Sequence, residues 1–125
     1  LVAHSLGCIL TAWWARHAPP AVVGKVQAAL LVAPGDVEQA ALRQHLPGWA
    51  PIARQRLPFA AVVVGSQNDP YCRLARAQQL AADWGAQWVD AGAAGHINSA
   101  SQLGDWPQGH ALLQDLVKDS VHGKR

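Results

Sequence analysis

The stretch Leu1-Val2-Ala3-His4-Ser5-Leu6-Gly7 (LVAHSLG) predicts that a serine stands on a sharp turn between a strand and a helix. Apolar residues come before this serine, and a run with helical character follows it. A turn this tight requires small residues two positions before and two positions after the serine, and Ala3 and Gly7 occupy those positions. Glycine is usual at both, so Ala3 departs from the common pattern by one methyl group. Taken alone, so short a motif also arises by chance.

Apolar runs that suit buried strands alternate along the chain with segments that suit helices. The longer apolar runs are continuous, which is typical of strands covered on both faces of a parallel sheet. A strand end is expected at residues 1–3, strands at 28–33, 59–65 and 86–89, and helices at 7–17, 36–45 (capped by Asp36), 73–84 and 108–120. This alternation predicts an α/β fold with one mainly parallel sheet and helices on both of its faces, in three layers.

The composition is that of a chain that buries a sizeable core. Half of the 125 residues are hydrophobic and 14% are charged, against a typical charged share of about 25%. The net charge is +2 and the basic residues are scattered, so no linear basic patch indicates a nucleic-acid partner. No apolar run approaches the roughly 18 residues of a membrane span, and no secretory signal is visible. Cys8 and Cys72 form no CxxC pair, and we expect reduced thiols in a cytoplasmic protein.

Three residues in separate segments have the types that nucleophilic catalysis requires. A serine hydroxyl becomes an effective nucleophile only when a histidine accepts its proton and an acid orients that histidine. Asp69 follows the expected strand at 59–65, and His96 follows the one at 86–89. By itself Asp69 could belong to an ordinary turn, and His96 to an ordinary loop. The order Ser5, Asp69, His96 is that of α/β-hydrolases, and together the three predict a Ser-His-Asp triad.

Tryptophans and the remaining histidines carry weaker indications. Trp49 and Trp106 lie in expected loops, at 46–58 and 90–107, and either indole could line an acyl pocket of the substrate site. Most other tryptophans are expected in the core, including Trp13, Trp14 and Trp84. His4 is expected to pack rather than react. The other histidines lack the spacing of metal ligands, so no metal site is expected.

The chain resembles the small serine hydrolases of the YdeN and retinoblastoma-binding-protein-9 family, which have the α/β-hydrolase fold. The resembling stretches are 1–7 (LVAHSLG), 29–34 (ALLVAP), 66–72 (SQNDPYC), 84–85 (WG), 92–98 (GAAGHIN) and 104–107 (GDWP). The resemblance implies Ser5 as nucleophile, Asp69 as acid and His96 as base. It also implies that the backbone N–H of Leu6 is one donor to the oxyanion, and it implies no cofactor.

The family pattern includes an N-terminal half that this sequence does not contain. That half has further strands and the loop that supplies a second oxyanion donor. We therefore expect residues 1–125 to form a single α/β-hydrolase domain that lacks its N-terminal strands and oxyanion-hole loop; the absence of any methionine agrees with this expectation. The sheet should then expose an apolar edge at residues 1–3, and a polar tail should follow Val121.

The expected activity is hydrolysis of small carboxyl esters, or alternatively amides, through an acyl-enzyme intermediate. Two alternatives remain open at this point. The chain could be a protein-interaction scaffold that retains the triad, since fold alone does not determine function. It could also be a fragment of such a hydrolase without activity of its own. The sequence identifies neither the substrate nor a protein partner.

Overall fold

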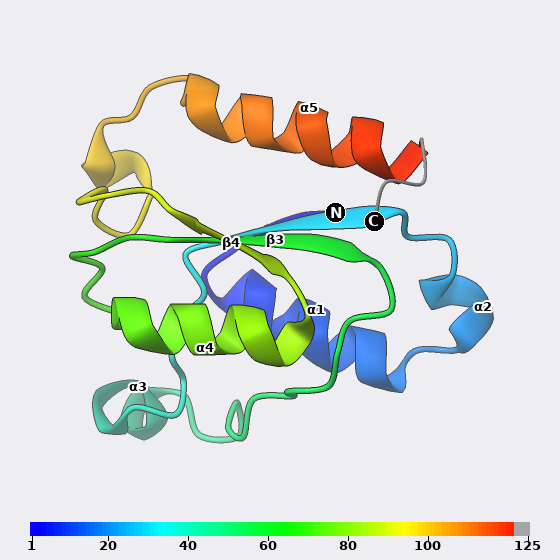
Figure 1. Ribbon diagram of the computed structural model, residues 1–125. Coiled ribbons are helices and arrows are strands. Elements are labelled where there is room, and N and C mark those ends of the chain that lie inside the picture. The colour runs from blue at the N-terminus through cyan, green and yellow to red at the C-terminus, as the bar shows by residue number, and fades with distance from the viewer. Residues whose placement is uncertain (122–125) are drawn as a thin grey trace.

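A four-stranded parallel sheet forms the centre of the molecule in the computed structural model, which describes residues 1–121 (Figure 1). The strands are β1 (Val2–His4), β2 (Ala28–Val32), β3 (Ala60–Gly65) and β4 (Gln87–Asp90), and they lie side by side in that order. Every neighbouring pair is parallel. All four carboxyl ends therefore point to the same edge of the sheet.

Helices cover both faces of this sheet, as Figure 1 shows. They are α1 (Leu6–His17), α2 (Pro20–Val23), α3 (Ala40–His45), α4 (Leu74–Trp84) and α5 (Pro107–Val121), with a short 3₁₀ helix, η1, at Ser99–Ser101. Helices α1 and α4 pack on one face, and α5 packs on the other. This arrangement confirms the predicted three-layer α/β fold.

The two central strands are buried along their whole length, which explains their continuous apolar sequences. Successive side chains point to opposite faces, so each strand contributes to two cores. Leu31 and Val63 face α1 and α4 and pack in one cluster with Trp84. Leu30 and Val62 face α5 on the opposite side. Burial of each such side chain contributes roughly 1.5–3 kcal/mol to the stability of the fold. Strands β2 and β3 are therefore rigid supports for the segments that follow them.

Strand β1 forms one edge of the sheet, and its outer side has no neighbouring strand among residues 1–121. Leu1 and Val2 are 55% and 63% exposed, so the predicted exposed apolar edge is present. Trp84 is buried as expected, but Trp13 is 53% exposed, and its assignment to the core was wrong. Helix α1 turns Trp13 away from the face that carries Cys8 and Ala12 into the core.

The predicted helix at 36–45 begins four residues later than expected, at Ala40, and Asp36 does not cap it. The Asp36 carboxylate instead accepts a hydrogen bond from the Glu38 N–H (3.1 Å) and pairs with the Arg76 guanidinium (3.1 Å). A turn stabilised by its own carboxylate competes with a helical start, and the pairing with α4 favours the turn. The polar tail expected after Val121 lies outside the described residues. No helix within residues 1–121 has the length and apolar character needed to cross a membrane.

Candidate active site

Ser5 stands on the elbow between β1 and α1, as its sequence context predicted. Its φ of 58° and ψ of −119° are strained for a residue with a side chain, and its N–H donates to the Val32 carbonyl at 3.0 Å. A Cβ atom at Gly7 would lie 3.4 Å from the Ala3 Cβ, and one at Gly35 would lie 3.6 Å from the Ser5 Oγ. The elbow therefore brings positions 3 and 7 within contact distance of each other, which agrees with the small residues Ala3 and Gly7 at these positions.

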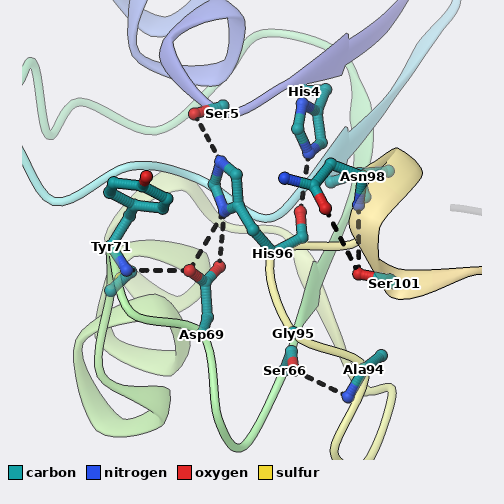
Figure 2. Close-up of polar contacts among 12 residues, drawn as sticks. His4, Ser5, Ser66, Asp69, Tyr71, Ala94, Gly95, His96, Asn98 and Ser101 are labelled. Carbon is teal, nitrogen blue, oxygen red and sulfur yellow. Dashed lines mark hydrogen bonds and ion pairs between the residues drawn. The ribbon is translucent and has the colours of Figure 1, made fainter.

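Ser5, His96 and Asp69 form one chain of hydrogen bonds, drawn in Figure 2. The His96 Nε2 lies 2.8 Å from the Ser5 Oγ, and the His96 Nδ1 lies 2.9 and 3.0 Å from the two Asp69 carboxylate oxygens. The His96 side chain is 9% exposed and that of Asp69 only 2%. An ionised carboxylate can only accept, so Nδ1 carries the ring proton and Nε2 of a neutral ring is free to accept from the serine hydroxyl.

Asp69 belongs to a turn and to this hydrogen-bonded chain at the same time. The turn follows β3, and the Asp69 Oδ1 accepts the N–H of Tyr71 at 2.8 Å. This contact, two residues along the chain, is the usual way in which an aspartate stabilises a turn. The turn and the acid were weighed as alternatives from the sequence, but the structure shows that the turn is what orients the carboxylate toward His96.

Two residues that the sequence analysis did not single out hold the loop that carries His96. The buried hydroxyl of Ser66 accepts the N–H of Ala94 at 2.9 Å and donates to the Asn68 Oδ1 at 3.0 Å. The same Asn68 oxygen accepts the N–H of Gly95 at 2.7 Å. The available signal was their position, because Ser66 directly follows the fully buried strand β3 and Asn68 lies two residues further on, where polar side chains lie at the functional edge of a parallel sheet.

A cavity of about 300 Å³ opens beside the serine hydroxyl. It is lined by Ser5, Leu6, Gly35, Leu42, Leu46, Tyr71, His96 and Asn98. Three leucines supply an apolar part, while the remaining side chains are polar. Leu6 is the first residue of α1, where a backbone N–H has no acceptor within the helix. Its N–H makes no hydrogen bond to any residue within 1–121, so it is available to a ligand.

Neither Trp49 nor Trp106 lines the cavity beside Ser5, and their expected role in an acyl pocket stays a prediction. Trp49 lines a separate apolar hollow together with Trp13 on α1 and packs on the core beneath the sheet. Trp106 has a φ of 48°, and its ring lies against Gly109 at the start of α5. Both indoles are half-buried: each packs against a core cluster and also lines a hollow away from Ser5.

The two cysteines are packing residues, and neither has the features of a reactive thiol. Both are free and buried. Burial raises the pKa of Cys8 far above its usual range, and its thiol donates to the Val32 carbonyl at 3.4 Å. Burial also raises the pKa of Cys72, to about 12. A thiol that stays protonated at neutral pH is a poor nucleophile. Within residues 1–121 no three His, Cys, Asp or Glu side chains are grouped in a way that could hold a metal ion.

A parallel sheet with a serine elbow after β1, a carboxylate after β3 and a histidine after β4 is the arrangement of α/β-hydrolases. The family described as serine hydrolase matches residues 1–115, and the chain belongs to this family. This membership, together with a solved YdeN-like structure that is 26% identical, confirms the resemblance to the YdeN-type serine hydrolases.

Two solved structures share this fold. A protein described as a YdeN-like hydrolase, from Pectobacterium atrosepticum, is 26% identical with a TM-score of 0.79, and the match covers 96% of this chain and 60% of that one. An α/β serine hydrolase homologue from Coxiella burnetii is 16% identical with a TM-score of 0.55, covering 95% of this chain and 47% of that one; this second likeness shows the fold alone. The chain thus spans 60% or less of the length of these two proteins. No curated protein matches the sequence.

Proposed function

We propose that the protein hydrolyses small carboxyl esters, with Ser5 as nucleophile, His96 as general base and acid, and Asp69 as the group that orients His96. The observation that carries this proposal is the 2.8 Å contact between the Ser5 Oγ and the His96 Nε2, on a ring whose Nδ1 is held by Asp69. Membership of the serine hydrolase family supports the same class of reaction.

The reaction proceeds through two similar halves. As the Ser5 Oγ attacks the carbonyl carbon of the ester, its proton passes to the His96 Nε2, and the carbonyl oxygen becomes an oxyanion. The oxyanion collapses, the carbon–oxygen bond to the alcohol breaks, and His96 returns the proton to the departing alcohol. Water then attacks the acyl-enzyme in the same way, with His96 again as base, and the acid leaves. The Asp69 carboxylate stabilises the charged imidazolium at each stage. An amide would follow the same route with an amine as the leaving group.

Stabilisation of the oxyanion is assigned to the N–H of Leu6, which points from the first turn of α1 and makes no hydrogen bond with the described part of the chain. The positive end of a helix also favours negative charge at this position. The second donor that the sequence analysis expects upstream of Leu1 stays a prediction. Loss of one such donor costs roughly 10²–10³ in turnover in a serine protease, so a single donor would leave a slow enzyme.

The cavity beside Ser5 supports a small substrate. A volume of about 300 Å³ is at the lower end of the range for small-molecule sites. The lining includes the apolar side chains of Leu6, Leu42 and Leu46, which suit the acyl chain of a small ester. It also includes the polar side chains of Tyr71 and Asn98, which suit a polar alcohol group.

The test is covalent labelling with a fluorophosphonate, located by peptide mass spectrometry. We expect the label on Ser5, and we expect Ser5→Ala to abolish it and His96→Ala to reduce it by at least about 10³-fold. The same variants should lose hydrolysis of nitrophenyl acetate to a similar degree. A folded protein that takes no label on Ser5 would contradict the proposal and favour the interaction-scaffold alternative.

A further inference from the structure

The imidazole of His96 lies between two aromatic rings, one on each side, as Figure 2 shows. The His4 ring centroid is 4.7 Å from that of His96 at an interplanar angle of 54°, and the Tyr71 centroid is 4.6 Å away at 59°. Tilted rings at this separation have a favourable aromatic geometry. Neither residue belongs to the hydrogen-bonded chain of Ser5, His96 and Asp69.

His4 also holds the main chain of His96. Its Nε2 lies 2.7 Å from the His96 carbonyl oxygen, and because a carbonyl can only accept, the Nε2 of His4 carries the proton and donates. His4 is the last residue of β1 and directly precedes Ser5. This single hydrogen bond therefore joins the nucleophile elbow to the loop of the base, across a sequence separation of 92 residues.

Tyr71 is anchored through its own main chain. Its N–H donates to Asp69 at 2.8 Å. Its carbonyl accepts the Asp36 N–H at 2.9 Å and the Gln39 side-chain amide at 2.8 Å. These bonds hold the main chain from which the ring, 44% exposed, projects beside His96. Tyr71 therefore contacts both Asp69 and His96: its N–H donates to the carboxylate of Asp69, and its ring lies beside the imidazole of His96.

We propose that His4 and Tyr71 are positioning residues, which hold the His96 imidazole between them so that Nδ1 stays on Asp69 and Nε2 stays on Ser5. This inference rests on the proposed function. The second side-chain torsion of a histidine has broad minima, and a hydrogen bond at Nδ1 alone allows the ring to swing about that atom. The contacts of His4 and Tyr71 with the two sides of the His96 ring restrict this rotation. A misplacement of about 1 Å can cost roughly 100-fold in rate, so a loss of this restraint should be measurable.

The first experiment measures the rate of labelling by a small ethyl fluorophosphonate at several probe concentrations. It yields the maximal labelling rate constant and, separately, the probe concentration at half-maximal rate. For His4→Ala and Tyr71→Leu we expect the maximal labelling rate constant to fall about tenfold each, and about 100-fold in the double variant. The probe concentration at half-maximal rate should change less than about twofold in His4→Ala, because Tyr71 lines the cavity beside Ser5 and His4 does not. Tyr71→Phe retains the ring and should recover most of the rate, whereas His4→Gln retains an N–H donor without the ring and should recover part of it. A role in folding alone would lower the fraction of labelled protein and leave the rate constant as it was.

The second experiment needs no activity. The proton on the His96 Nδ1 is held by a carboxylate that is 2% exposed, so we expect a resolved downfield proton resonance that disappears in Asp69→Ala. The inference requires this resonance to broaden or vanish in His4→Ala and Tyr71→Leu. If His4→Ala or Tyr71→Leu unfolds, His4→Phe serves in its place. This variant keeps a ring at position 4 and removes only the hydrogen-bond donor, and it should still slow labelling several-fold.

The outcomes distinguish the two proposals. Wild-type protein that labels on Ser5, together with His4→Ala and Tyr71→Leu variants that label equally fast and keep the resonance, would overturn the positioning role and leave the proposed function standing. Wild-type protein that does not label would overturn the proposed function. The resonance would then still decide whether the two rings hold His96.

Discussion

The Nε2 of His96 lies 2.8 Å from the Ser5 Oγ, although 91 residues separate them along the chain. Ser5 follows β1 at one edge of the sheet, whereas His96 follows β4 at the other. Three strand spacings amount to about 14 Å, so the segment after β4 must return across the carboxyl ends of β3 and β2. The hydrogen bonds of Ser66 and Asn68 to this segment, and that of His4 to His96, hold it in its returned position.

We predict that Asp69→Asn lowers turnover by about 10⁴-fold, as a wrong histidine tautomer does in serine proteases. The Tyr71 N–H donates to Oδ1 of Asp69, so an asparagine would place its oxygen there and its NH₂ group at the position of Oδ2. That group would donate to the His96 Nδ1, the ring proton would move to Nε2, and Nε2 could no longer accept from Ser5. Nitrophenyl ester hydrolysis measures the loss. A variant with more than a tenth of wild-type turnover would contradict the orienting role of Asp69.

We predict that Ser66→Ala lowers both stability and activity. Without the hydroxyl, the Ala94 N–H loses its acceptor, and an unsatisfied polar group of this kind costs about 1–3 kcal/mol in the free energy of unfolding. The loop of His96 loosens, so fluorophosphonate labelling slows as well. Urea unfolding and labelling rates measure the two effects. Ser99→Ala is the matched control, because Ser99 is exposed and should change stability by no more than about 0.5 kcal/mol.

We predict that Gly35→Ala retains the fold but narrows the substrate cavity. The added Cβ would lie 3.6 Å from the Ser5 Oγ and 3.7 Å from the Leu6 Cδ2, which is ordinary contact distance. One methyl group in a site is worth roughly 1–3 kcal/mol of discrimination. The ratio of kcat/KM for nitrophenyl butyrate to that for nitrophenyl acetate should therefore fall about tenfold or more. An unchanged ratio would place the acyl chain in another part of the cavity.

We predict that stability falls with rising pH in part because of Cys72. Burial raises the pKa of this thiol from 9.0 to about 12. Above pH 9.0 the thiol of the unfolded chain loses its proton, whereas the thiol of the folded chain keeps it. The stability that Cys72 contributes below about pH 9 is therefore lost progressively toward pH 12. The loss is up to about 1.4 kcal/mol per pH unit for this group. Urea unfolding at pH 8 and pH 10.5 measures the slope. Cys72→Ala should show a shallower slope, and equal slopes would remove Cys72 as a cause.

The sequence predicted the strands within about two residues, because continuous apolar runs such as residues 28–32 and 60–65 have few alternatives to a buried strand. It also predicted α4 and its end at Gly85, which adopts the left-handed conformation with a φ of 68°. The start of α3 was predicted too early, because Asp36 pairs with Arg76, 40 residues away, and does not cap the helix. The role of the two loop tryptophans stays a prediction, since the direction of an indole in a loop depends on the surface beneath it.

The sequence by itself determined the local elements of this protein and the types of residue at its strand ends, because backbone sterics and hydrophobic spacing act over a few residues. It thereby indicated Ser5, Asp69 and His96 as a group. Only the tertiary structure decided which polar atoms meet: Ser66 with Ala94, and His4 with His96. These partners lie 28 and 92 residues apart, and their contact depends on how the sheet and its returning loop bring distant segments together.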